Sequence, residues 1–468
     1  MTDGESKGDR ISRRAILVSL PVSALAGGFA AGGIASALAS HRLPVAVGGA
    51  TPAPTATPSP TATPAPPSKP RPSTGDAAPG IVGDGSTDNA SALNALLANA
   101  QQGDDIVLPA GEYLIESVLR LQSGVNLIGA GAGVTTVRLA DNSQSPFVLA
   151  SGMTQVRVSG ITFDGGIQDQ DAVSLQFDGC SDVVVENCAF IRMSHAVHVY
   201  TTAFESSERI VIRGNYFSQI SDYAVRVTEG TETVLIEDNV VADVAKKNAT
   251  SPAAFYIRGV DVTVTGNTVL GSDDTAVLVA GTTTRNVAVV GNRLHTTLVC
   301  VFFGSGATEG SIVGNTLLSD LDFGVHLFDR NGGSSRTVVA QNHLIATGKS
   351  GVQVEGVSDF VISSNLIFDP GTRSGMKTEW CCGITLTRTD GGSASQFSVI
   401  GNLIASDSSD SQMEHAILVS VEAKHVQIAS NTWRGARSDS VMLKKKLDAP
   451  FSVETEDEII SSRTLRTV

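Results

Sequence analysis

The chain has 468 residues and a formal net charge of −14, without a basic block in its central part. This charge argues against nucleic acid and anionic membrane surfaces as partners, although a local arginine or lysine cluster could still bind an acidic polysaccharide. Glycine is abundant, at 47 residues, and aromatic residues make up 5% of the chain, a composition typical of turn-rich β proteins. Five cysteines are too few for a disulfide-held fold, and only Cys180 and Cys188 are spaced so that they could pair.

Residues 1–45 are predicted to be an export signal. Arg13 and Arg14 precede an apolar run, rich in alanine and glycine, from Ala15 to Ala39. The arginine pair resembles a twin-arginine signal, while an ordinary secretory signal and an uncleaved membrane anchor are open alternatives. We therefore expect bacterial-type export to an extracellular or cell-surface location. Membrane contact is expected only through this segment, if it is not cleaved.

Residues 46–75 form a tract rich in proline and threonine, which predicts an extended, semi-rigid linker. Such a stalk would hold the predicted folded domain, residues 76–446, away from a surface. Residues 447–468 are polar and are expected to be a C-terminal cap or a loose tail.

Asparagine recurs every 23 to 37 residues through the predicted domain. A period of about 20 to 50 residues indicates a solenoid, and the absence of helical periodicity makes each repeat one coil of a parallel β-helix. We expect the asparagines to stack in a turn and to hydrogen-bond from coil to coil. They are Asn187, Asn215, Asn239, Asn267, Asn292, Asn315, Asn342, Asn365, Asn402 and Asn431.

The strand about eleven residues beyond each asparagine follows an apolar-X-apolar pattern, as in Val197-His198-Val199 and Val325-His326-Leu327. Alternation with period two places the flanking residues inside and the middle residue outside. The asparagine spacing therefore predicts which side chains share the outer face of the solenoid.

The stretch GDGSTDNASALNALLANA, followed by DDIVLPAGEYLI, covers residues 83–100 and 104–115. It resembles the opening of the pectate-lyase and rhamnogalacturonase superfamily of right-handed parallel β-helices. The resemblance implies an all-β, right-handed parallel β-helix whose short N-terminal helix caps the open end of the solenoid. Lyases, hydrolases, epimerases and phage tail proteins share this opening, so it does not determine the chemistry.

Three coils are longer than the others between the asparagine and the next strand, namely those of Asn239, Asn365 and Asn402. Insertions in a solenoid often mark its binding face. We expect them to flank a trough of four uninserted coils, which is about 20 Å long at about 4.8 Å per coil. Such a trough suits an extended polysaccharide.

The candidate catalytic residues of this trough are Asp273, Asp274, Asp322 and His326. Asp274 and Asp322 should lie two coils, or about 10 Å, apart, near the upper limit for the two carboxylates of an inverting glycosidase. Hydrolysis of an acidic, pectin-like glycan is therefore our first hypothesis, and solvated coil corners are the alternative reading of these acids. The polygalacturonase motifs N-T-D, G-H-G and R-I-K are absent from the sequence, which argues against that particular activity.

A second cluster, on three successive coils, contains His198, Arg226 and Tyr256 together with His195, Tyr200, Tyr223 and Arg258. A uronan lyase or C5-epimerase needs a cation for the substrate carboxylate and a base for the C5 proton, roles that Arg226 and His198 or Tyr256 could fill. A plain exposed β face is the alternative. The remaining candidate substrate-binding residues are Phe302, Gln353 and Trp380.

A noncatalytic glycan-binding or adhesive surface solenoid is the alternative from a different functional class. The sequence favours an enzyme, and its expected partner is a polysaccharide. No cofactor is expected, and calcium near the acids is an open alternative, although no loop has a recognisable ligand spacing.

Overall fold

The computed structural model describes residues 80–140, 146–166, 173–201, 206–245, 251–330, 333–387, 394–445, 447–454 and 459–461. The predicted export signal and linker lie outside these residues, as does the centre of the Asn239 insertion. In the described part, no helix is long and apolar enough to span a membrane.

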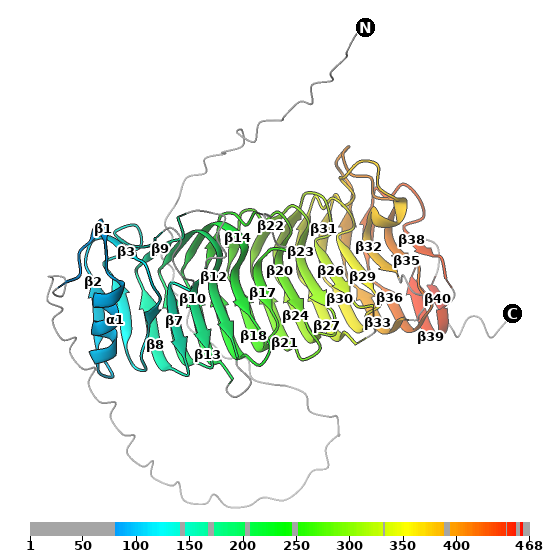
Figure 1. Cartoon of the computed structure of the whole chain (residues 1–468). Coiled ribbons are helices and arrows are strands. Elements are labelled where there is room, and N and C mark those ends of the chain that lie inside the picture. Colours follow the sequence, from blue (N-terminus) through cyan, green and yellow to red (C-terminus); the bar gives the residue numbers. More distant parts are fainter. Residues whose placement is uncertain are drawn as a thin grey trace, which may run out of the picture. The chain divides into compact units, whose positions relative to one another are not determined.

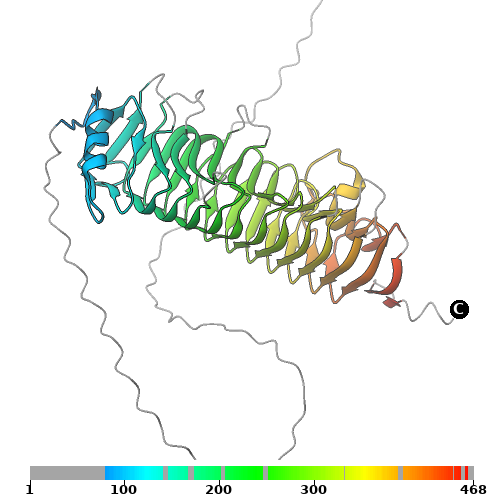
Figure 2. The same ribbon diagram turned by 60° about the horizontal axis from the view of Figure 1, so that its bottom comes forward.

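The described chain is a parallel β-helix of about 13 turns, which confirms the predicted fold class. Figures 1 and 2 show the coils stacked from helix α1 (Ala90–Asn99), at the blue end, to the last strands at the red end. Each coil contributes strands to columns of parallel neighbours, which we call the first, second and third columns.

The first column follows the asparagines along the chain. It contains β1 (Asp84–Asp88), β3 (Gly111–Ile115), β6 (Thr135–Leu139), β9 (Thr162–Asp164), the first parts of β12 (Ala189–Tyr200) and β14 (Tyr216–Val227), β16 (Val240–Val241), β19 (Thr268–Val269), β22 (Arg293–Thr296), β25 (Thr316–Ser319), β28 (His343–Ile345), β31 (Leu366–Phe368), β34 (Leu403–Ala405) and β37 (Thr432–Arg434).

The second column carries the predicted functional face. It contains β4 (Leu119–Arg120), β7 (Val148–Ser151), β10 (Val173–Asp178), the last parts of β12 and β14, β17 (Ala253–Ile257), β20 (Thr275–Ala280), β23 (Val299–Gly304), β26 (Val325–Phe328), β29 (Val352–Glu355), β32 (Cys382–Thr387), β35 (His415–Val419) and β38 (Val441–Leu443). Strand β12 pairs with β9 at its start and with β10 at its end, so the first two columns form one sheet.

The third column is a separate sheet of 15 strands, ten of which directly precede a repeating asparagine. It contains β2 (Asp105–Leu108), β5 (Asn126–Gly129), β8 (Thr154–Ser159), β11 (Ser181–Glu186), β13 (Glu208–Arg213), β15 (Glu232–Glu237), β18 (Val260–Thr265), β21 (Arg285–Val290), β24 (Thr308–Val313), β27 (Ser335–Ala340), β30 (Ser358–Ser363), β33 (Ala394–Ile400), β36 (Ala423–Ala429), β39 (Leu447–Glu454) and β40 (Ile459–Ser461).

The C-terminal end of the solenoid lies in this third column. Residues 447–454, which the sequence analysis assigns to a cap or tail, form β39 and pair in parallel with β36. Strand β40 then pairs antiparallel with β39. A reversed strand of this kind covers an edge that would otherwise be free to pair with another chain.

Alternating apolar side chains fill the interior between the columns, as period-two patterning requires. Phenylalanines at equivalent positions of successive coils stack on one another. The ring centroids of Phe163 and Phe190 are 5.5 Å apart, and those of Phe190 and Phe217 are 5.1 Å apart. Stacking of identical positions extends the core along the axis.

The predicted asparagine ladder is present from Asn215 onward. The side-chain Nδ2 of Asn215 donates to Oδ1 of Asn239 over 3.0 Å, and its backbone N–H donates to the same oxygen over 3.0 Å. The same pair of bonds recurs at each step until Asn431. Buried amides thus satisfy one another and the backbone at the turn.

Asn187 is an exception, and its predicted place in the ladder is wrong. Its side chain is exposed and its φ is +53°, in the left-handed region that asparagine tolerates. Cys188 occupies the ladder position instead, and its backbone N–H donates to Oδ1 of Asn215 over 3.0 Å. The repeat at Asn187 is therefore shifted by one residue relative to the others.

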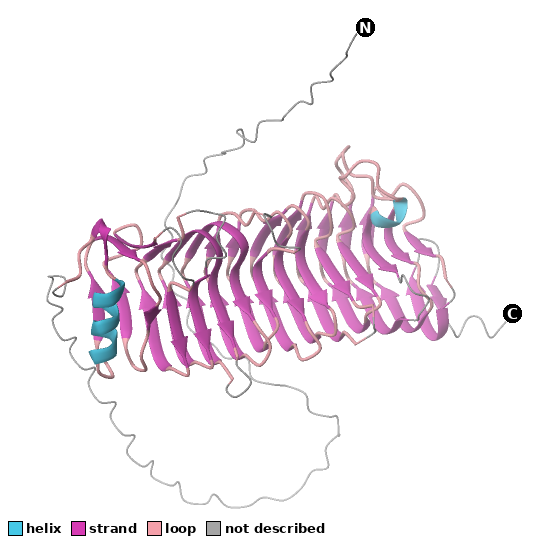
Figure 3. Ribbon diagram, in the orientation of Figure 1, coloured by secondary structure: helices cyan, strands magenta, loops and turns pink. Residues whose placement is uncertain are grey.

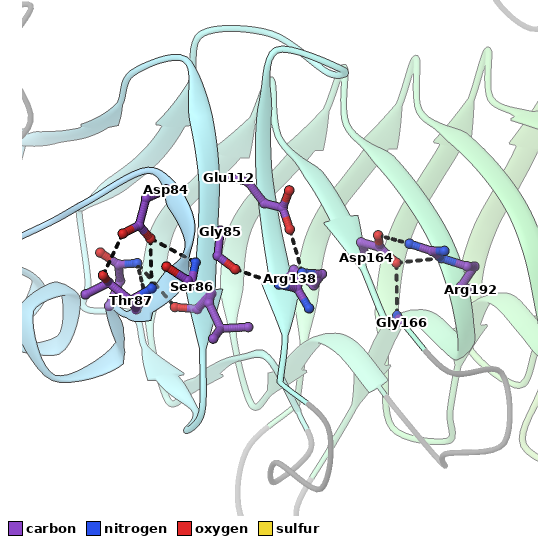
Figure 4. A network of polar contacts seen from close by, with 11 residues as sticks. Asp84, Gly85, Ser86, Thr87, Glu112, Arg138, Asp164, Gly166 and Arg192 are labelled. Atoms are coloured by element: carbon purple, nitrogen blue, oxygen red, sulfur yellow. Dashed lines mark hydrogen bonds and ion pairs between the residues drawn. The ribbon is translucent and has the colours of Figure 1, made fainter.

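The N-terminal end is held by the predicted capping helix and by charged side chains of the first coils. Leu93 and Leu97 of α1 are fully buried against the solenoid. Backbone N–H groups and the hydroxyl of Thr87 donate to Asp84 and lower the pKa of its carboxyl group. Figure 4 shows this turn and, farther along, Arg138 bridging Glu112 and Gly85. It also shows the neighbouring ion pair between Arg192 and Asp164.

All five cysteines lie in the described part and are buried free thiols. Cys180 and Cys188, the pair that the sequence left open, flank opposite ends of β11. Six extended residues separate them, so they are too far apart for a disulfide.

Candidate functional site

The outer face of the second column carries one continuous row of side chains, which we call the outward row. Strand register places these residues side by side on successive coils, as the asparagine spacing predicted. The row runs His198, Arg226, Tyr256, Leu278, Phe302, His326, Gln353, Thr385, Leu418 and Met442.

The outward row changes from open to covered along the solenoid. Its side chains are partly exposed from His198 to His326. Gln353, Thr385 and Leu418 are each 0% exposed, although they occupy equivalent outward positions. The prediction of Gln353 as an accessible substrate-binding residue on the trough floor is therefore wrong.

The long insertion after Asn365 contacts the second column at Thr385 and beside β29, and it ends in the 3₁₀ helix η1 (Thr378–Trp380), the short helix near the C-terminal end in Figure 3. Ser350 Oγ donates to the Trp380 carbonyl over 3.1 Å, and Thr385 Oγ1 donates to the Glu379 carbonyl over 3.3 Å. The insertion therefore bends down onto the second column.

The open part of the row begins with a polar aromatic group that we call the N-terminal cluster, made of His195, His198, Tyr200, Asp222, Tyr223, Arg226 and Tyr256. Its residues come from β12, β14 and β17. The long, bent strands β12 and β14 bring the corner residues His195, Asp222 and Tyr223 next to the outward row.

Contacts within the N-terminal cluster are short. His195 Nε2 lies 2.9 Å from Asp222 Oδ2, and the rings of His195 and His198 are 6.1 Å apart between centroids. The rings of Tyr223 and Tyr256 are stacked at 5.0 Å. The guanidinium carbon of Arg226 lies 5.6 Å from the Tyr223 centroid and 5.8 Å from that of Tyr256.

Burial sets the protonation of this cluster. Desolvation, followed by the charges of Arg226 and His195, lowers the pKa of His198 to about 3, so its imidazole is neutral. Desolvation and the neighbouring Asp222 raise the pKa of Tyr223 to about 12, so its hydroxyl keeps its proton. Within the described residues, Nε2 of His198 and Nε of Arg226 are buried without a hydrogen-bond partner.

A second group, which we call the C-terminal cluster, lies at the covered end of the row. Its members are Phe302, Asp322, Phe323, His326, Phe328, Lys349, Glu355 and Trp380. The ammonium of Lys349 lies 3.0 Å from Asp322 Oδ1 and sits over the rings of Phe323 and Trp380, at 4.8 and 4.6 Å from their centroids.

His326 connects the other members of the C-terminal cluster. Its Nε2 lies 3.5 Å from Glu355 Oε1, and its ring is 5.5 Å from Phe302 and 5.3 Å from Phe328. Burial opposes the ionisation of Glu355, but bonds from His326 and Gln353, with the nearby charge of Lys349, lower the pKa of its carboxyl group.

Sequence reasoning missed Lys349 and Glu355 as members of this site. Glu355 lies two residues beyond Gln353 on the same strand, so alternation alone could have placed it on the outer side. Lys349 comes from a turn, and no periodic signal marks it.

The predicted catalytic acids lie at the corner between the first and second columns. Asp274 directly precedes Thr275, which is in register with Val299 on the next coil. Asp322 directly precedes Phe323, whose carbonyl accepts a bond from Cys300 on that same coil. The two acids are therefore two coils, or about 10 Å, apart. Thr275 Oγ1 donates to Asp274 over 2.9 Å, and Asp273 is exposed. Catalysis by these residues stays a prediction.

Two of the predicted insertions, those after Asn365 and Asn402, contact each other. Ser411 Oγ donates to the Pro370 carbonyl over 2.6 Å, and the Gln412 N–H donates to the Gly371 carbonyl over 3.0 Å. They border a polar cleft of about 570 Å³. Its lining comprises Leu318, Asp320, Ala346, Asp369, Thr372, Ser374, Ser408, Ser409, Asp410, Gln412 and Arg437.

Within the described ranges, no group of three or more histidine, cysteine, aspartate or glutamate side chains is arranged to hold a metal ion.

The structure is a parallel β-helix with one continuous outward row, which is the fold class that the opening residues predicted. The family model described as rhamnogalacturonase A/epimerase, pectate lyase-like matches residues 78–297. That range contains the whole N-terminal cluster and ends before Phe302.

Curated relatives match over shorter stretches. Mannuronan C5-epimerase AlgE3 of Azotobacter vinelandii is 34% identical over 112 residues, which are 22% of this chain and 6% of that protein. Alginate lyase 7 of the same organism is 28% identical over 176 residues, 36% of this chain and 19% of that protein. The matches therefore span less than a fifth of either relative.

Solved structures extend the similarity over most of the described solenoid. The A-module of mannuronan C-5 epimerase AlgE4 of Azotobacter vinelandii has a TM-score of 0.54 and 19% identity, covering 80% of this chain and 98% of the module. The catalytic unit of an α-1,3-glucanase from Streptomyces thermodiastaticus has a TM-score of 0.52 and 12% identity, covering 78% and 69%. At such identities the likeness shows the fold alone.

Proposed function

We propose that the protein acts on an acidic polysaccharide and removes the C5 proton of a uronate residue at the N-terminal cluster. This step is common to uronan C5-epimerases and lyases. The observation that carries the proposal is Arg226, whose partly unsatisfied guanidinium lies beside a neutral His198 and a protonated Tyr223. The epimerase and lyase relatives, and a family model that spans this cluster, support it.

Arg226 has the chemistry to bind the uronate carboxylate. The C5 proton is α to that carboxylate, so its removal places negative charge on the carboxylate oxygens. A guanidinium held in place by the rings of Tyr223 and Tyr256 stabilises this charge without reorganisation. Arg226 is thus expected to favour the transition state over the bound substrate.

His198 is the proposed base. Its Nε2 is neutral and without a partner among the described residues, so it can accept the C5 proton. A bound carboxylate would counter the charge of Arg226 and raise the pKa of His198, which makes the imidazole a stronger base when substrate is present.

Tyr223 is the proposed acid, because its raised pKa keeps the hydroxyl protonated. Once the C5–H bond has broken, a proton delivered to C5 from the opposite side of the ring gives the epimer. Alternatively, the C4–O bond breaks with formation of a C4–C5 double bond, and the proton goes to the leaving oxygen. The two outcomes share the first step and differ in the atom that Tyr223 protonates.

The test is to incubate the protein with polymannuronate, polyguluronate and polygalacturonate in deuterated water. We expect deuterium at C5, detected by NMR, together with either inverted residues or the ultraviolet absorbance of unsaturated products. Arg226→Ala should reduce the rate by at least about 100-fold, and the matched control Arg285→Ala, exposed on the third column, should leave it unchanged. Full activity of Arg226→Ala would disprove the proposal.

Hydrolysis at the C-terminal cluster is the second candidate, favoured by the proximity of the Asp322 and Glu355 carboxylates to Lys349 and His326. Pairs of carboxylates cleave glycosidic bonds by acid–base catalysis. New reducing ends without ultraviolet absorbance, abolished by Asp322→Asn or Glu355→Gln, would favour it. Tight polysaccharide binding without any product would contradict both enzymatic proposals and favour the adhesive solenoid.

A further inference from the structure

We infer that the outward row is a groove with one closed end, and that it holds the terminus of a polysaccharide chain rather than an internal stretch. The terminal sugar lies on the C-terminal cluster, and the reaction takes place a fixed number of residues from that end. This inference rests on the proposed function and adds where along the polymer the protein acts.

The closure is visible in the exposure of the outward row. His326 is partly exposed, whereas the next three outward positions, Gln353, Thr385 and Leu418, are each 0% exposed. Strand pairing is unbroken from β26 through β29 to β32, so the floor itself continues. The groove ends because another segment lies on the floor.

That segment is η1, and its attachment to the floor is specific. The carbonyls of Trp380 and Glu379 accept bonds from Ser350 and Thr385 on two successive coils. The Trp380 ring packs on Lys349, whose ammonium is paired with Asp322 at 3.0 Å. A chain that continued past His326 would have to displace these contacts, so η1 acts as an end wall.

The chemistry at the wall suits a chain terminus. Asp322 and Glu355 place two carboxylates near Lys349 and His326, so the local charge does not favour a further uronate carboxylate. The second oxygen of each carboxylate, which is not paired with Lys349 or His326, is instead a good acceptor for the hydroxyl groups that a terminal sugar presents. Phe302 and Phe328, on either side of His326, provide apolar surface for the C–H face of the ring.

The distance between the N-terminal and C-terminal clusters sets the minimum length of a substrate that contacts both. Five coil steps separate His198 from His326, which is about 24 Å at about 4.8 Å per coil. A pyranose in an extended chain advances by about one coil spacing, so about five sugar residues separate the wall from the reacting residue. Substrates shorter than this cannot reach both clusters.

Binding stoichiometry tests the closure without requiring activity. Uronan chains of three to four different lengths, each of narrow size distribution, are titrated into the His198→Gln variant, which lacks the proposed base and keeps Arg226, and binding is followed in a calorimeter or by light scattering. We expect one protein molecule per chain at every length, because each chain has one end of the required kind. A stoichiometry that rises in proportion to chain length would overturn the inference.

If the protein is enzymatically active, the size of its products gives a second test of the closed end. The rate should rise steeply until the oligomer reaches about six residues and stay constant beyond, and lyase products should cluster near five residues. Trp380→Ala should broaden the products and let several proteins bind one long chain, while Ser409→Ala, in the neighbouring insertion, should change neither. Activity with products of all lengths from the start would overturn closure and leave the proposed function standing. One protein molecule bound per uronan chain at every chain length, without any enzymatic activity, would support the closed end and contradict the proposed function.

Discussion

His198 and Arg226 are paired in register on adjacent coils, and both point their side chains to the outer face. After burial, the positive charge of Arg226 is the largest cause of the low pKa of His198. Arg226 therefore supplies the proposed carboxylate-binding group and also helps to keep His198, the proposed base, neutral. This relationship makes the proposed site testable before any substrate is identified.

Removing the charge of Arg226 should raise the pKa of His198 from about 3 towards its ordinary value of 6.5. The rise will be partial, because burial is the larger cause and remains in Arg226→Ala. Titration of the imidazole by NMR measures it directly. Arg226→Lys should leave the pKa near that of the wild type, and Arg285→Ala serves as a distant control. An unchanged pKa in Arg226→Ala would show that the two side chains are not electrostatically coupled.

His198 should also make the fold sensitive to acid. Its pKa is lower in the folded state than in the unfolded chain, so the unfolded chain binds more protons between about pH 3 and pH 6.5. This contribution to stability is complete above pH 6.5 and is lost as the pH falls through that window. Replacing His198 with glutamine should therefore flatten the fall of the melting temperature between these pH values. An equally steep fall in His198→Gln would contradict the assignment.

Breaking the asparagine ladder should destabilise the centre of the solenoid. Asn315 accepts two bonds from Asn292, and its Nδ2 donates to Asn342 and to the Val289 carbonyl. Asn315→Ala leaves buried backbone groups unsatisfied, which should cost about 2–5 kcal/mol of the free energy of unfolding. Asn187→Gly, outside the ladder, should cost less than about 1 kcal/mol. Denaturant titration of both variants makes the comparison, and equal costs would contradict the ladder's role.

The end wall should depend on the pair formed by Lys349 and Asp322. Their side chains are only 13% and 18% exposed, so removing one partner leaves a charge that is largely cut off from water. Lys349→Met or Asp322→Asn alone should destabilise the protein by about 3 kcal/mol, and the double variant by less than the sum of the two. Additive losses in this double-mutant cycle would show that the ion pair does not stabilise the wall.

The asparagine spacing predicted much of the fold and of the outer face because both follow one periodic constraint. Six of the ten residues in the outward row, from His198 to Met442, lie eleven residues beyond their asparagine. The other four, which are Tyr256, Phe302, Thr385 and Leu418, join the row from coils of other lengths. The spacing gave a wrong prediction at Asn187. In each coil a left-handed turn residue directly precedes the ladder residue, and asparagine can occupy either position; Asn187 occupies the turn position. At that coil the ladder residue is Cys188.

Features that depend on contacts between coils could not be predicted from the asparagine spacing. The contact between Thr385 and η1 depends on where a long insertion folds back, and no local pattern encodes that path. Glu355 meets His326 from a neighbouring coil, and Lys349 meets Asp322 from a turn. The 2.9 Å contact between His195 and Asp222 requires the bend within β12 and β14, which the repeat length does not reveal.

The buried thiols give the solenoid a set of built-in probes of local opening. Burial raises the pKa of Cys188 and Cys300 to about 12 and that of Cys382 to about 11, so these thiols cannot react as thiolates while their coils are closed. They lie in early, middle and late coils respectively. The order in which a thiol reagent modifies them under mild denaturation therefore reports whether the coils open from one end, from the other, or together.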